Sequence, residues 1–256
     1  MFIESRLKLY WARRHAYDLS AGWQRFVQVY SDPVKWREFN RANSTDYPQH
    51  HVPVPVELRM MLGDCIRCMR SSLDYLVSAL AREAELPDNN TVFPFAKERK
   101  GLEASFEPPS DLVGSHGKKR RAGALYELSL KYPDLKDVIL DKIKPYSAED
   151  GAGAMGDLVW RVVTTDNIDK HRLILITTSV SFIRDIRIVG GGRITGGTII
   201  GDAIRMGSGE LEKNSQLSVD MQFGEPARLS GKPVTRTLVE ALNFTGKIIE
   251  IFESHF

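Results

Sequence analysis

The chain of 256 residues is 42% hydrophobic and 27% charged, with a formal net charge of +2 at pH 7. That composition is typical of a globular protein and excludes a disordered chain. A charge so near zero excludes a general attraction to nucleic acid or membranes, so such binding needs a local patch. No apolar run approaches the ~20 residues of a membrane span, and the charged N-terminal stretch lacks the apolar core of a signal peptide. With only two cysteines there is no disulfide framework, and we expect a cytoplasmic protein without membrane contact.

The first thirty residues are predicted to form a helix, because apolar residues recur at steps of three or four. The expected buried stripe consists of Leu7, Trp11, His15, Leu19, Trp23, Phe26 and Tyr30. His15 is a candidate ligand-binding residue, although a lone histidine on an apolar face is most often a hydrogen-bonded core residue. It gains a functional role if it meets Asp74 or Asp169 in space.

The strongest helical pattern follows the proline-rich segment Val34–Pro55, which is expected to be extended. Its predicted buried stripe is Leu58, Leu62, Ile66, Met69, Leu73, Val77 and Leu80. The helix is expected to stop before Pro87, and a loop-rich segment follows over Asn89–Lys119. Within that segment, Phe93-Pro94-Phe95 is expected to pack against the core.

Helical spacing continues through the middle of the chain. Two short helices are predicted at 121–131 and 135–143, and a longer helix at 154–170 leads into the apolar run 173–178. The last segment, 234–252, also has helical spacing.

Between these helices the pattern changes to period two. Three alternating segments after residue 178 are separated by glycine-rich and polar turns, which is typical of antiparallel strands. We therefore predict an α+β fold: an N-terminal helical bundle of about five helices, an antiparallel β-meander and a C-terminal helix. One domain is expected over 1–256, in which residues 1–172 are helical and residues 173–256 hold the meander and the final helix. A domain boundary near residue 172 is the alternative.

Arg70 and Asp74 form the first candidate site. They are i,i+4 neighbours at the edge of the predicted buried stripe, so they can form an ion pair. In one interpretation the pair only closes the rim of the core. In the other, Arg70 points into a cleft and binds an anion such as phosphate, while Asp74 holds it in place.

The second candidate site is the run Asp166–Arg172, where the longer helix ends. A carboxylate, a lysine, an imidazole and a guanidinium occupy four successive positions, Asp169, Lys170, His171 and Arg172. Such a set can supply a general base and stabilise phosphate charge, with Asp169 and His171 as catalytic and Lys170 and Arg172 as ligand-binding candidates. The helix dipole alone also favours cations at a helix C-terminus, which is the structural alternative.

The positions of the cysteines give little support for a metal site or a redox site. The pair Cys65-x-x-Cys68 falls in the middle of a predicted helix, and no second Cys/His pair has a spacing suitable for zinc. Both cysteines are expected to serve packing, and no metal or other cofactor is predicted. The one basic run, Lys118–Arg121, is interpreted as a solvated loop, with a phosphate-backbone contact as the alternative.

Several short motifs occur in the order of a known family. They are L-G-D-C-I-R-C-M-R-S-S-L-D-Y-L-V from Leu62, F-P-F at Phe93–Phe95, K-P-Y at Lys144–Tyr146 and D-N-I-D-K-H-R at Asp166–Arg172. Through them the chain resembles, over residues 1–175, a widespread family of uncharacterised bacterial proteins with an L-R-S-A-L-D-H-L helix and an N-I-D-K-H-R segment. The first helix of that family tends to carry a histidine, which His15 matches. The resemblance does not bring an activity with it.

The helix motif is also distantly similar to that of HEPN-type helical domains, many of which are metal-independent ribonucleases. Their signature is an arginine followed, after four to six residues, by a histidine. Arg70 matches the arginine, and Tyr75 stands where the histidine would be. The resemblance therefore implies that His171 or His15 takes the role of that histidine.

We expect a HEPN-like cytoplasmic protein that binds RNA or a nucleotide in a helical cleft, with a defence- or toxin-type role. The expected phosphate-binding residues are Arg70 and Arg172, the residues that orient them are Asp74 and Asp169, and the proton-transfer group is His171. The alternative is a non-catalytic interaction or scaffold protein, forming homo- or hetero-oligomers, in which both sites are structural ion pairs. An enzyme acting on a small anionic metabolite is a third option.

Overall fold

The structure is a computed structural model. It describes residues 1–30, 54–87, 91–108, 124–172, 177–184, 186–188, 192–194, 197–199, 216–224 and 228–256. For residues 29–30, 167–172 and the strands before Met221, only the backbone is described. Most of the predicted extended segment Val34–Pro55, and the basic run Lys118–Arg121, lie outside the described residues.

The chain divides into two compact units. The first unit comprises Met1–His15, Gly63–Leu173 and Leu238–Phe256, and the second comprises Ala16–Leu62 and Ile174–Thr237. That the whole chain forms one domain stays a prediction. None of the described helices is long and apolar enough to cross a membrane.

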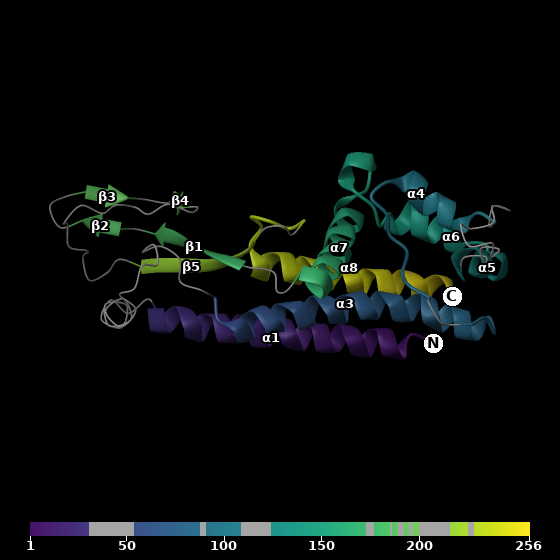
Figure 1. The fold of residues 1–256 in the computed structure, drawn as a ribbon, viewed down its shortest axis with the longest axis horizontal. Coiled ribbons are helices and arrows are strands. Elements are labelled where there is room, and N and C mark those ends of the chain that lie inside the picture. The colour runs from purple at the N-terminus through teal and green to yellow at the C-terminus, as the bar shows by residue number, and fades with distance from the viewer. Residues whose placement is uncertain are drawn as a thin grey trace. The chain divides into compact units, whose positions relative to one another are not determined.

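Parts of three long helices lie in the first unit, and Figure 1 shows these helices side by side. They are α1 (Ile3–Tyr30), α3 (Val56–Glu83) and α8 (Val234–His255). Ser72 on α3 donates its hydroxyl proton to the carbonyl oxygen of Ser5 on α1 at 2.7 Å. The ring of Phe2, which directly precedes α1, meets Phe252 of α8 edge to face, with 6.0 Å between centroids. The first half of α1 therefore packs against both of the other helices.

The prediction for α3 is confirmed. All seven residues of its predicted apolar stripe are no more than 5% exposed, and the helix ends at Glu83, before Pro87. The C-terminal helix is confirmed as α8, and Phe93, which was expected to pack against the core, is fully buried. Strong period-3.6 patterns located these elements because their buried faces are apolar along the whole helix.

The predicted buried face of α1 is wrong over its first half. Leu7 and Trp11 are 56% and 47% exposed, whereas Leu9 and Ala12 are buried. Both sets recur at helical spacing, so the pattern alone could not decide which one faces inward. The face that packs on α3 and α8 is the one with the smaller side chains, which allows the helices to approach closely.

Shorter helices lie between α3 and α7 (Ala154–Arg172) in the sequence. They are α4 (Arg99–Glu103), η1 (Ala104–Phe106), α5 (Ala124–Lys131), α6 (Leu135–Asp137), η2 (Val138–Ile143) and η3 (Ala148–Asp150). The helices predicted at 121–131, 135–143 and 154–170 are present, but the second changes from an α-turn to the π-helix η2.

The end of η2 fixes the start of α7. Lys144 has a left-handed backbone, with φ of 55°, and ends η2 directly before Pro145. Its carbonyl group lies against Gly156, where a Cβ atom would overlap it and would also lie 2.7 Å from the carbonyl oxygen of Ile143. Only glycine fits this contact without a shift of the backbone.

The predicted α+β fold with an antiparallel β-meander is wrong. The described residues are mostly helical. The strands are β1 (Thr177–Arg184), β2 (Ile186–Ile188), β3 (Gly192–Ile194), β4 (Gly197–Ile199) and β5 (Gln216–Phe223).

The pairing of these strands also differs from a meander, in which each strand pairs with the next. Here β1 pairs with β4 and β5, with Ser181 opposite both Ile199 and Val219, while β2 pairs with β3. Alternating residues mark segments that can form strands, but they do not specify the partner of each strand.

Candidate functional site

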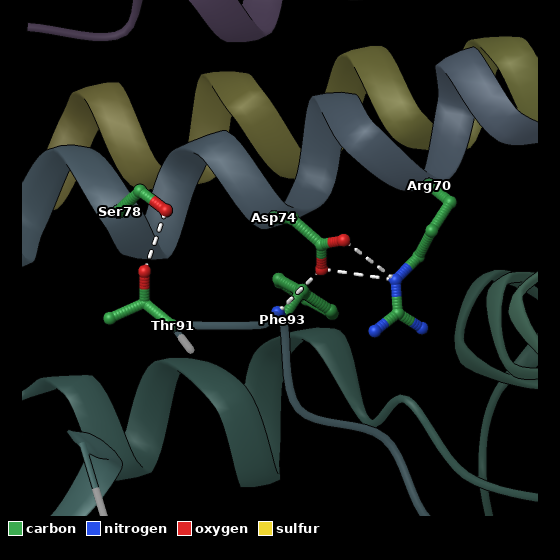
Figure 2. A network of polar contacts seen from close by, with 5 residues as sticks. All are labelled: Arg70, Asp74, Ser78, Thr91 and Phe93. Carbon is green, nitrogen blue, oxygen red and sulfur yellow. Dashed lines mark hydrogen bonds and ion pairs between the residues drawn. The ribbon is translucent and has the colours of Figure 1, made fainter. Parts of the chain in front are cut away.

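One face of α3 holds the extended segment Thr91–Phe95 through polar side chains spaced one helical turn apart (Figure 2). The hydroxyl groups of Ser78 and Thr91 share a hydrogen bond of 2.6 Å. One turn earlier, the backbone N–H of Phe93 donates to Oδ1 of Asp74 at 2.8 Å. One further turn back, the guanidinium of Arg70 lies over the ring of Phe95, 4.6 Å from its centroid. We call these three contacts the ladder.

The ladder forms because two repeats nearly coincide. Four residues of an α-helix rise about 6 Å, and two residues of an extended chain rise about 6.6 Å. Helix positions 70, 74 and 78 can therefore meet alternate residues of a segment that runs in the opposite direction. Asp74 supplies an acceptor for a backbone N–H that would otherwise be partly buried without a partner.

Arg70 and Asp74 form the predicted ion pair. The Nε–H of Arg70 donates to both carboxylate oxygens of Asp74, each at 3.0 Å. The side chains of Arg70 and Asp74 are 9% and 28% exposed. The pair is therefore more buried than the rim contact that the sequence allowed, and removing either partner would leave a poorly solvated charge.

The terminal nitrogens of Arg70 do not bind Asp74, because Asp74 accepts only from Nε. Figure 2 shows both nitrogens pointing away from α3. Nη1 is buried, and among the residues that the structure describes it has no hydrogen-bond partner. An unsatisfied buried donor costs about 1–3 kcal/mol, and more when it is charged. An ordered water or a bound anion would remove that cost.

The second candidate site is described only incompletely. Asp166 lies on α7 and is 1% exposed, and α7 continues to Arg172, beyond its predicted end at Lys170. The side chains of Asp169, Lys170, His171 and Arg172 lie outside the described residues. The expected meeting of Arg70 with His171 therefore stays a prediction.

His15 does not join the first candidate site. Its half-buried ring lies beside Trp11, with 6.5 Å between the ring centroids. The partners of Asp74 are Arg70 and Phe93, so within the described residues Asp74 does not meet His15.

The two cysteines are free and unsuited to nucleophilic chemistry. Cys65 is buried and donates to the carbonyl oxygen of Ala12 at 3.3 Å. Burial raises the pKa of Cys65 to about 12, and burial also raises the pKa of Cys68. A thiol with a raised pKa holds its proton at neutral pH and is a poor nucleophile. Among the described residues, no three His, Cys, Asp or Glu side chains are placed to hold a metal ion.

The sequence predicted the pair of Arg70 and Asp74 and the packing of Phe93–Phe95 against the core, but not the contact between them. Thr91 and Phe95 belong to a segment with no helical or strand pattern. A usable signal was present: polar residues at 70, 74 and 78 on one helix face, and the alternating Thr91, Phe93 and Phe95 further on.

Comparisons with protein-family models, with curated proteins and with solved structures find no match for this chain. The resemblance to a bacterial family and to HEPN-type domains therefore stays a prediction. Two of the motifs that carry it, the helix motif around Arg70 and the F-P-F segment, contact each other through the ladder.

Proposed function

We propose that the protein binds a phosphate group of an RNA strand or a nucleotide through Arg70. The observation that supports this most directly is the buried Nη1 of Arg70, which has no partner among the described residues. Guanidinium and phosphate match in charge and in geometry, because two N–H groups of the fork can donate to two phosphate oxygens.

The neighbours of Arg70 support the same proposal. Asp74 binds only Nε, and Phe95 packs against the face of the guanidinium. Together they fix both the direction and the plane of the terminal nitrogens before a ligand arrives. A group held in this way loses little side-chain entropy on binding, which improves affinity.

In this proposal the end of α7 completes the site. Lys170 and Arg172 add positive charge, Asp169 orients them, and His171 transfers the proton if the bound RNA is cleaved. A histidine titrates near neutral pH, which suits general acid–base chemistry without a metal. The cytoplasmic location and the defence- or toxin-type role stay predictions from the sequence.

The test is binding and cleavage of labelled single-stranded RNA in EDTA, with binding of ATP measured in parallel. We compare the wild type with Arg70→Ala, His171→Ala and the control Arg67→Ala, whose side chain is 54% exposed on the same helix. We expect Arg70→Ala to weaken binding about tenfold or more, as the loss of a charged hydrogen-bonding group does, and Arg67→Ala to change it little. We expect His171→Ala to abolish cleavage but retain binding.

A second candidate is a non-catalytic interaction protein in which the pair is structural. The observation that favours it is the ladder itself, since Asp74 is fully used in holding Phe93 and Arg70. If wild-type protein binds neither RNA nor ATP, while Arg70→Ala lowers the thermal unfolding temperature, the phosphate-binding proposal is wrong and the structural role stands.

A further inference from the structure

Arg70 buries the end of its side chain that arginines usually leave in water. The side chain is 9% exposed, and of the guanidinium nitrogens Nη1 is the one that is both buried and unpaired among the described residues. Arginines normally keep the charged head in solvent and bury only the stem. A ligand must therefore insert a group beside Arg70 to reach Nη1, and a ligand that only passes over the surface does not reach it.

The extended segment that carries Phe95 is held on two sides. The ladder joins it to α3. On its other side, the backbone N–H of Ala96 donates to the carbonyl oxygen of Pro145 at 3.3 Å, and the N–H of Ser147 donates to that of Lys97 at 3.1 Å. Opening this segment lengthwise, to admit a strand alongside the guanidinium, would break hydrogen bonds on both sides.

The charge of Arg70 is already balanced at close range. Both carboxylate oxygens of Asp74 accept from Nε at 3.0 Å, so the pair as a whole attracts a distant anion only weakly. Binding at this position therefore depends on short hydrogen bonds from the terminal nitrogens, which are directional. Such bonds favour a ligand that presents several acceptor oxygens at its tip.

We propose that Arg70 recognises a terminal phosphate monoester, at the end of an RNA strand or on a mononucleotide. This inference rests on the proposed function, in which Arg70 binds phosphate. A monoester projects as an end with three strong acceptor oxygens, so one oxygen can reach the enclosed Nη1 while another accepts from Nη2. A phosphodiester inside a strand carries a sugar on either side, and these sugars meet the surface around Arg70 before the phosphate oxygens reach Nη1.

The test uses one short single-stranded oligoribonucleotide, labelled at an internal base. It carries a 5′-phosphate, a 3′-phosphate or hydroxyl groups at both ends, and fluorescence anisotropy in EDTA gives the dissociation constants. We expect at least one phosphorylated form to bind about tenfold more tightly than the hydroxyl form, since the terminal phosphate adds hydrogen bonds between charged groups. Equal binding of the phosphorylated and hydroxyl forms overturns the inference.

Small competitors separate the possible sources of the phosphate. We expect AMP to displace the phosphorylated RNA and adenosine to leave it bound. Inorganic phosphate, added in the same way, distinguishes free phosphate from a nucleotide as the source of the same group. Displacement by adenosine as strong as that by AMP overturns the inference, because the nucleoside carries no phosphate.

Arg70→Lys tests whether the guanidinium is responsible. It keeps a cation beside Asp74, which should preserve the fold, but its single nitrogen is taken by that carboxylate. We expect the preference for a terminal phosphate to disappear in Arg70→Lys and to be unchanged in the control Arg67→Ala. A preference that persists in Arg70→Lys means that another group holds the terminal phosphate, and it overturns the inference.

Failure of the inference and failure of the proposed function give different results. If all three RNA forms bind equally and Arg70→Lys weakens each of them, Arg70 binds internal phosphates, so the inference is wrong and the proposed function stands. If the wild type binds none of the RNA forms and no AMP, both are wrong.

Discussion

Two arginine–aspartate pairs lie on α3 within eleven residues, and they differ in burial, in distance and in the number of contacts. Arg67 and Asp64 are 54% and 48% exposed and 4.0 Å apart, with one contact between them. Arg70 and Asp74 are 9% and 28% exposed, and two contacts of 3.0 Å join them. Water screens the first pair, so it contributes little to folding.

The buried pair is different because a third group depends on it. Asp74 also accepts the backbone N–H of Phe93, so its carboxylate connects α3 to a segment distant in sequence. The comparison teaches that an ion pair within a helix gains structural importance from burial and from a shared acceptor.

The largest expected effect is that of Asp74→Ala. This substitution leaves Arg70 buried without its counter-ion and the Phe93 N–H without its acceptor, so we expect a loss of about 3 kcal/mol in the free energy of unfolding. The matched change Asp64→Ala should cost less than about 1 kcal/mol. Urea denaturation of both variants measures the difference, and equal losses would contradict the comparison.

A smaller effect is expected from the neutral contact of the ladder. Ser78→Ala removes the 2.6 Å hydrogen bond to Thr91 and should lower the free energy of unfolding by about 1 kcal/mol. Ser105→Ala, at an exposed hydroxyl, is the control and should be nearly neutral. A Ser78→Ala loss as large as that of Asp74→Ala would mean that charge adds nothing to the ladder.

The smallest effect concerns an exposed pair and pH. The hydrogen bond from Arg6 lowers the pKa of Glu253 from its ordinary value of 4.5. The folded protein therefore binds this proton less tightly than the unfolded chain does. The contribution of the pair is present above pH 4.5 and is lost as pH falls through the lowered pKa of the folded state.

Because the pair is exposed, that contribution should be at most a few tenths of a kcal/mol and should shrink with added salt. Stability of the wild type and of Glu253→Gln, measured between pH 3 and pH 7, isolates it. The two curves should converge at the acidic end, and curves that stay parallel would show that the pair contributes nothing.

The local sequence pattern predicted those features of the fold that depend on helix geometry alone. The stripe of α3 and the spacing of Arg70 and Asp74 both follow from 3.6 residues per turn, and both are present. The first half of α1 was predicted with the wrong face inward because it has two apolar faces. The exposed one carries Trp11, and only the packing of α3 and α8 decides between them.

Features that depend on distant partners could not be predicted in the same way. The contact of Asp74 with Phe93 joins residues 19 apart in sequence, and no local pattern encodes it. The strand order β4-β1-β5 likewise depends on which segments meet, so the expected meander was wrong although alternation marked strand-forming residues.

The helix and the extended segment of the ladder have repeats of slightly different length, so their side chains coincide at only a few positions. From Arg70 to Ser78 the helix rises about 12 Å, while Phe95 to Thr91 spans about 13 Å. Over the same distance the helix face also turns by about 80°. A fourth contact would be out of step in both length and direction. A helix can therefore hold an extended segment side chain by side chain over about three contacts, after which the two must separate.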